Sequence, residues 1–209
     1  MISARVHPPA VVDVLHRARQ VHANARMALK RLATGSEPHE QLEAVQTAVV
    51  FGVATTHVLQ KLRGVVDGFD DWWAPWRAQL SADKLMRYLY ELRSTILKEG
   101  GHDTDRVTDL GVLNLFEDLG DAPPGAQAVY IGTEGVGWIV RRDDGTHTEV
   151  PVVVPDNKVR VWLQFKDCPR EHLGTRLHDV SVTDVCGLYL AFLDRILDDA
   201  DTQPWNLRT

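Results

Sequence analysis

Apolar positions recur with helical spacing in the first third of the chain. A seven-residue repeat predicts an amphipathic helix over residues 10–33, followed by a short turn at 34–36. The repeat consists of Val11, Ala18, Ala25 and Leu32. The next segment, residues 38–66, is apolar on all sides in its middle, which is typical of a buried helix. Because the connection is short, we expect these two helices to form a long antiparallel hairpin.

Two more helical segments are predicted further along the chain. An aromatic turn over residues 69–76 precedes a third helix, which should be capped by Ser81 and should end at Glu99 before two glycines. A final helix should begin near Ser181, whose spacing to Asp184 resembles a capping box.

The pattern between these helices changes to alternation with period two. Three runs predict strands over Val136–Arg142, Thr146–Val154 and Lys158–Phe165, joined by turn-forming residues. We read residues 102–125 as an irregular connection. The predicted fold class is therefore α+β and predominantly α, a four-helix-type bundle with a three-stranded antiparallel sheet inserted before the last helix. The corresponding division is 1–125 for the bundle and its connecting loop, 126–180 for the sheet insertion and 181–209 for the returning helix.

Composition indicates an ordinary globular protein with an unevenly distributed charge. The 209 residues are 44% hydrophobic and carry a net charge of −6, which disfavours bulk attraction to nucleic acid. Residues 1–35 carry six basic side chains and one acid, whereas residues 179–201 carry six aspartates and one arginine. We therefore expect the first and last helices to lie side by side, with Arg19, Arg26 or Arg31 facing Asp194, Asp198 or Asp199. A basic nucleic-acid surface on the first helix is the alternative.

Neither a membrane span nor a leader sequence is evident in this pattern. The longest uninterrupted apolar run, residues 48–54, is too short to cross a bilayer, and the first ten residues lack an apolar core. Cys168 and Cys186 have no redox or zinc spacing. We expect a cytoplasmic protein with two free thiols and no membrane association.

An arginine in the apolar face of the third helix is the residue that packing explains least. On a helical wheel Leu85, Leu89, Leu92 and Ile96 form the centre of the apolar arc, and Arg93 falls inside it. A buried guanidinium needs acceptors, because an unpaired buried charge costs several kcal/mol. We expect Arg93 to pair with a carboxylate or with loop carbonyls, and an anion-contacting role is the alternative.

The segment from Leu92 to Gly100 resembles the motif region of the HEPN superfamily, whose members are helical bundles from toxin–antitoxin, phage-defence and RNA-processing systems. Arg93 corresponds to the arginine of the motif and Ser94 to its polar position. Lys98 stands where that family has histidine, and His102 lies too far along the chain. The resemblance implies RNA cleavage without a metal by an arginine–histidine pair, usually duplicated across a dimer. The sheet insertion resembles uncharacterised bacterial proteins.

The sequence leaves three functional readings open. The first is a non-catalytic binding or regulatory module for a protein partner or RNA, with Arg93 and Lys98 as binding residues. The second is a metal-independent endoribonuclease of toxin or phage-defence type, with Arg93 as the cation and Glu99 as the base. The third is a self-associating structural protein that uses its tryptophans or a sheet edge.

A cluster of tryptophans supplies further candidate binding residues. Trp72, Trp73 and Trp76 are three of the six tryptophans of the chain and follow Phe69 closely. Such side chains stack on bases or anchor interfaces, although they more often close the end of a bundle. Together with the alanine positions of the first helix, they lead us to expect a homodimer through the bundle.

We expect neither a metal nor a cofactor. Asp103, Asp105 and Asp109 lack the glycine and glutamate of a calcium loop. The histidine pairs have no companion at ligand spacing; they are His16 with His22 and His172 with His178. The GTEGVG element at 132–137 lacks the lysine of a phosphate-binding loop.

Overall fold

The computed structural model describes residues 7–35, 38–110, 118–132, 135–154 and 159–208. The chain forms two compact units. The helical unit consists of Met1–Asp105 and Leu163–Thr209, and the strand unit consists of Arg106–Trp162. The strand unit thus begins earlier in the chain than the predicted insertion at 126–180, and the chain returns to the helical unit earlier, at Leu163.

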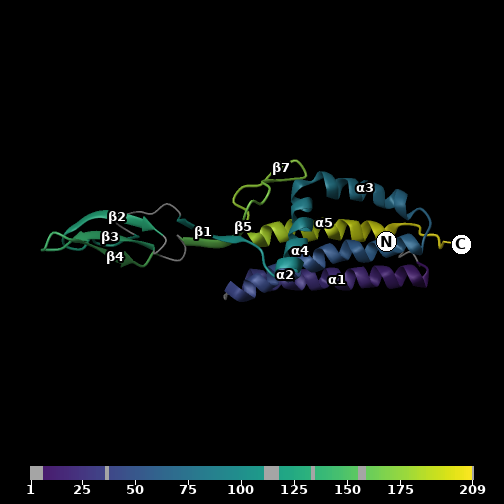
Figure 1. The fold of residues 1–209 in the computed structure, drawn as a ribbon, viewed down its shortest axis with the longest axis horizontal. Coiled ribbons are helices and arrows are strands. Elements are labelled where there is room, and N and C mark those ends of the chain that lie inside the picture. The colour runs from purple at the N-terminus through teal and green to yellow at the C-terminus, as the bar shows by residue number, and fades with distance from the viewer. Residues whose placement is uncertain (1–6, 36–37, 111–117, 133–134, 155–158, 209) are drawn as a thin grey trace. The chain divides into compact units, whose positions relative to one another are not determined.

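The helical unit is built on a hairpin of two long helices with a third long helix beside it. Its elements are α1 (Pro9–Thr34), α2 (Pro38–Leu59), the 3-10 helix η1 (Gln60–Gly64), α3 (Phe69–Ala82), α4 (Lys84–Glu99) and α5 (Val182–Thr202). Helices α1, α2 and α5 run side by side, and α4 crosses them (Figure 1). Helix α3 continues into α4 across a single residue, Asp83.

The seven-residue repeat of the first helix faces the core, as predicted. All four repeat positions are buried between α1 and its neighbours. Helix α2 supplies a further set of buried side chains, which are Ala44, Val45, Ala48, Val49, Val53 and Leu59. By length and composition alone, the helical stretch His39–Gly64 could cross a membrane, and half of its most apolar window is buried within the protein. A core helix meets the same criterion, so the stretch is weak evidence for a span.

The ends of two predicted helices differ from the observed ones. The predicted helix over 38–66 changes to 3-10 geometry at Gln60. Ser81 is not the cap of the next helix, because it belongs to α3 and its hydroxyl donates back to the carbonyl of Arg77. The N-cap of α4 is Asp83, whose Oδ1 accepts a hydrogen bond from the Met86 amide at 2.9 Å. Serine and aspartate are both strong caps, and tertiary contacts to Asp83 decide between them.

The first and last helices pair through their opposite charges, which confirms the prediction. Arg19 donates to Asp198 at 2.9 Å and also binds Asp201, and Arg26 lies 3.4 Å from Asp194. These arginines are roughly half exposed, so each pair contributes only about 0.2–1 kcal/mol and mainly sets the placement of α1 on α5. The predicted capping box is also present, with Ser181 as the N-cap of α5 and Asp184 at N3.

The strand unit contains a three-stranded antiparallel sheet in the order β2 (Ala126–Gly132), β3 (Gly135–Arg141), β4 (His147–Val152). Two of its strands were predicted. The third predicted strand is present as β5 (Val159–Phe165), but it pairs with β1 (Thr104–Leu110) in a separate two-stranded sheet. Strand β2, which was not predicted, takes its place and pairs with β3 as far as Gly132 and Gly135, which are register partners.

A short hairpin of β6 (Glu171–His172) and β7 (Thr175–Arg176) precedes α5 in the helical unit. Helices make up most of the described structure and the three-stranded sheet is antiparallel, so the α+β, predominantly α class is confirmed.

Candidate functional site

A hollow of about 650 Å³ opens in the helical unit where η1, α3 and α4 meet. We call it the arginine hollow. Its volume is within the range of sites that hold small organic ligands. Its lining comes from four helices and η1 and includes Thr56, His57, Gln60, Arg63, Trp73, Arg77, Leu80, Ser81, Met86, Arg87, Tyr90, Glu91 and Tyr189.

The floor of the arginine hollow consists of buried side chains. Tyr189 of α5 is 4% exposed, and Trp73 of α3 and Met86 of α4 are similarly enclosed. The Tyr189 ring lies against the backbone of α2 at Gly52, where a Cβ atom would come within 2.6 Å of Tyr189 Cε1. Glycine in the middle of a helix costs about 1 kcal/mol relative to alanine, so this close approach accounts for its presence.

The Tyr189 hydroxyl is the unusual polar group of this floor. Within the part of the chain that the structure describes, it makes no hydrogen bond, and it is not among the fully enclosed polar atoms. Burial raises the pKa of Tyr189, so the group is a neutral hydroxyl that can both donate and accept. The hydroxyl is therefore open to the hollow although the rest of the side chain is buried, which makes Tyr189 a candidate ligand contact.

Three arginines from three elements border the arginine hollow. They are Arg63 of η1, Arg77 of α3 and Arg87 of α4, and all three are exposed. Arg63 Nε donates to Asp70 at 2.8 Å, whereas Arg77 and Arg87 form no ion pair with any residue that the structure describes. Among the described lining residues, Glu91 is the one acid. The border therefore carries an excess of positive charge and suits an anionic ligand.

An exposed tyrosine and a histidine lie on the α2–α4 side of the same hollow. Tyr90 is 53% exposed, and its ring meets the His57 ring edge-on with centroids 6.3 Å apart. Partial burial and then the nearby charge of Arg93 lower the pKa of His57. The two rings form an aromatic surface beside the arginines.

The structure places the predicted catalytic pair in different surroundings. Arg93 is half-buried beside His57, and its Nε is enclosed without a hydrogen-bond partner among the described residues. The carboxylate or carbonyl partner that we expected for Arg93 is absent there. Glu99 is exposed and lines another hollow with His102 and Lys166. Lys98 is exposed on α4 and has no ion-pair partner in the described chain.

The side chains of the tryptophan cluster make contacts with other residues of the same chain. Trp72 and Trp76 both donate their indole N–H groups to Asp199 of α5, at 2.8 and 2.9 Å, and Trp73 stacks on Phe69. These contacts fix α3 on α5, which agrees with the reading that the cluster closes the bundle. Of the three, Trp73 also reaches the arginine hollow. The alanines of the first helix are buried as well, so the homodimer stays a prediction that neither feature supports directly.

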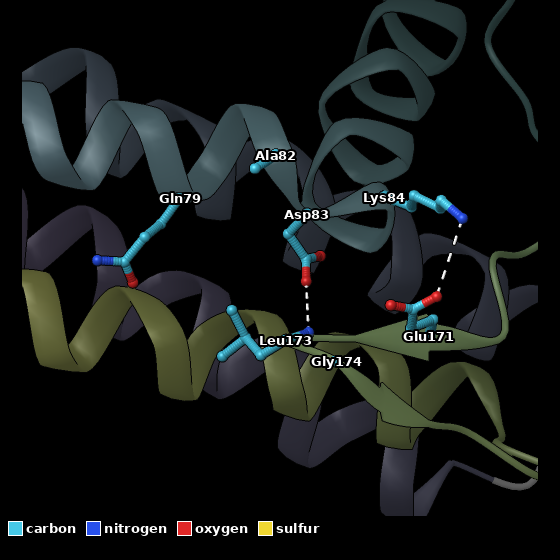
Figure 2. A pocket seen from close by; sticks show the side chains of 7 residues that line it. All are labelled: Gln79, Ala82, Asp83, Lys84, Glu171, Leu173 and Gly174. Carbon is cyan, nitrogen blue, oxygen red and sulfur yellow. Dashed lines mark hydrogen bonds and ion pairs between the residues drawn. The ribbon is translucent and has the colours of Figure 1, made fainter.

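A smaller hollow of about 240 Å³ lies between the α3–α4 corner and the β6–β7 hairpin (Figure 2). Asp83 points into it and accepts the Leu173 amide at 2.6 Å, while Lys84 faces Glu171 at 3.8 Å. His172 Nδ1 lies 3.2 Å from the same Asp83 carboxylate. These hydrogen bonds outweigh burial and lower the pKa of Asp83. The hydrogen-bonding capacity of this carboxylate is already used, so we assign Asp83 a structural role. Its hydrogen bonds hold the α3–α4 corner, on either side of which Arg77 and Arg87 lie in the chain.

Sequence reasoning missed the arginine hollow because its residues are far apart in the chain. Gly52 was the one available clue, as an isolated glycine within an apolar helix indicates close packing by another group. Among the described residues, no group of three or more histidine, cysteine or acidic side chains could hold a metal ion.

Comparison with known proteins identifies one related family. Residues 10–182 match the family described as bacteriophage lambda protein ea47. Neither a curated protein sequence nor a solved structure matches the chain.

Proposed function

The chain belongs to the family of bacteriophage lambda protein ea47, and we propose that it is a non-catalytic module that binds RNA in the arginine hollow. The observation that carries this proposal is the convergence of Arg63, Arg77 and Arg87 on one hollow whose described lining holds a single acid. Arginine donors hold phosphate oxygens in well-defined directions, and two of these three side chains have no internal partner in the described chain.

The aromatic side of the hollow favours RNA over an acidic protein segment. Proteins that bind single strands combine a positive groove with exposed aromatic rings on which bases stack. Tyr90 and His57 supply such rings next to Arg87. The net charge of −6 confines attraction for a polyanion to this local surface, so we expect moderate affinity with a small number of phosphate contacts.

The nuclease alternative receives less support from the geometry. Cleavage through a 2′-hydroxyl needs a base and a cation at one phosphate. Arg93 lies beside His57, whereas Glu99 lines a different hollow, and the described residues include no ion pair between them. We therefore expect RNA to be bound and to remain intact.

Fluorescence anisotropy with a labelled single-stranded RNA tests the proposal. Replacing Arg77 and Arg87 together by alanine should weaken binding at least about tenfold. It should also reduce the slope of log K against log salt by about 1.4, or roughly 0.7 for each lost phosphate contact. The matched control is Arg17→Ala with Arg31→Ala, which removes the same charge from exposed positions of α1 outside this hollow. Equal weakening by the two double variants would reject the hollow as the RNA site.

Glu91→Gln provides a change of the opposite sign. It removes the one acid from the described lining and should tighten RNA binding several-fold. If an acidic peptide binds and RNA does not, the ligand of the hollow is a protein partner and not RNA. If wild type shortened the RNA and Arg93→Ala left it intact, the nuclease reading would be restored.

A further inference from the structure

We infer that the arginine hollow is a nucleotide site, in which a base enters as far as the Tyr189 hydroxyl while its phosphate stays at Arg77 and Arg87. The inference deepens the proposed function and rests on it for the case in which the nucleotide is part of a strand. The shared chemistry is a planar ring with polar edges joined to a phosphate, and a free nucleotide would present it as well.

The depth and lining of the arginine hollow distinguish it from a charged surface groove. A site for backbone phosphates alone needs only exposed cations. Here the exposed arginines surround a space of about 650 Å³ whose floor is made of buried Tyr189, Trp73 and Met86. Such a mixture of apolar and aromatic surface with a few polar groups suits the faces of a base.

Tyr189 is the polar group that would recognise the edge of the base. Its hydroxyl has no partner within the described chain although the residue is 4% exposed. A ligand with a ring nitrogen, carbonyl or amino group would complete this unmade hydrogen bond. The absence of a side chain at Gly52 lets the Tyr189 ring pack directly on α2, so the hydroxyl is presented by two packed helices.

The polar groups of the hollow differ in exposure in a way that matches the two parts of a nucleotide. Arg77, Arg87 and Tyr90 are exposed, and the buried hydroxyl of Thr56 is already used in a 2.8 Å bond to the Val53 carbonyl. Among the described residues, Tyr189 therefore offers a free hydroxyl at the floor, whereas the charged groups are confined to the border. A nucleotide would place its base against the Tyr189 hydroxyl and its phosphate against Arg77 and Arg87.

Isothermal titration of the full chain with nucleoside 5′-monophosphates and with ribose 5-phosphate tests the inference. We expect at least one nucleotide to bind at least about tenfold more tightly than ribose 5-phosphate. Tyr189→Phe, which keeps the ring and removes only the hydroxyl, should lose about tenfold in affinity for that nucleotide, or about 1.4 kcal/mol. Equal affinity for nucleotide and ribose 5-phosphate, or full affinity in Tyr189→Phe, would overturn the inference.

Further measurements separate this inference from the proposed function and from misfolding. An oligoribonucleotide with one abasic residue should bind more weakly than its intact counterpart if the base comes from a strand, and equally well if only a free nucleotide binds. If RNA affinity falls on replacement of Arg77 and Arg87 but is unchanged in Tyr189→Phe, the proposed function is upheld and the nucleotide site is rejected. If a nucleoside monophosphate binds and RNA does not, the nucleotide site is upheld and the proposed RNA-binding function is rejected. In ring-labelled protein the Tyr189 resonances should shift on addition of nucleotide and those of Tyr130, in the strand unit, should not.

Discussion

Tyr189 of α5 touches α2 at Gly52 so closely that a single methyl group would have to displace it, since a Cβ atom on residue 52 would lie 2.6 Å from Tyr189 Cε1. This contact joins the last helix of the chain to the centre of the first hairpin. Tyr189 also lines the arginine hollow, so the packing at Gly52 sets the position of a residue of the candidate site.

Gly52→Ala should reveal this dependence. Overpacking in a core typically costs about 1–3 kcal/mol, which offsets the gain of about 1 kcal/mol that alanine brings to a helix interior. We expect unchanged or lower stability and weakened ligand binding. Gly187→Ala in α5 is the matched control, because its Cβ would meet nothing within 4 Å. Urea unfolding should show that the control gains stability, and a comparable gain in Gly52→Ala would contradict the contact.

Asp199 should contribute more to stability than its neighbour in the chain. It accepts the indole N–H groups of Trp72 and Trp76 and the side-chain amide of Gln203. Asp199→Ala leaves these donors without their acceptor and should cost about 3 kcal/mol in chemical denaturation. Asp198→Ala removes an exposed ion pair with Arg19 and should cost less than about 1 kcal/mol. Similar losses in the two variants would refute this role of Asp199.

The buried histidine of α1 should make stability depend on pH. Burial lowers the pKa of His22, and this effect exceeds the opposite influence of Asp194, whose Oδ1 lies 2.7 Å from His22 Nε2. Arg19 and Arg26 add to the lowering. In the unfolded chain His22 has a pKa of about 6.5, so as pH falls it takes up a proton at a higher pH than in the folded chain. The contribution of neutral His22 is complete above that pH and declines as pH falls below it.

Thermal or urea unfolding between about pH 7.5 and 5 should measure this effect. Wild type should lose more stability over that interval than His22→Gln, by at most about 1.4 kcal/mol per pH unit. The comparison with the variant removes the contributions of other titrating groups. A steeper loss in His22→Gln than in wild type would reverse the assigned sign.

Arg93 should influence the protonation of His57 more than the stability of the fold. Its positive charge lowers the pKa of His57, in addition to the larger effect of burial. Arg93→Ala should therefore raise the His57 pKa in an NMR titration, whereas Arg93→Lys, which keeps the charge, should leave it closer to wild type. Because no described residue pairs with Arg93, we expect little change in unfolding free energy. A loss of several kcal/mol would point instead to a buried structural arginine.

Local signals along the chain determined most of the helical unit. The seven-residue repeat predicted α1 and its buried face, the apolar middle of α2 placed that helix at the centre, and the capping box marked the start of α5. The opposite charges of the first and last helices predicted their pairing. Periodicity, caps and charge act over a few residues or along a whole helix, so they can be read without knowledge of distant contacts.

Only the tertiary structure decided which strands pair, which residue caps α4 and where the arginine hollow lies. Strand β5 has the alternation expected for the three-stranded sheet, yet it pairs with β1, because alternation fixes the faces of a strand and not its partner. Asp83 caps α4 in preference to Ser81 because Leu173, distant in sequence, also donates to it. Arg63, Arg77, Arg87 and Tyr189 come from separate elements, and their convergence depends on long-range packing that no local pattern encodes.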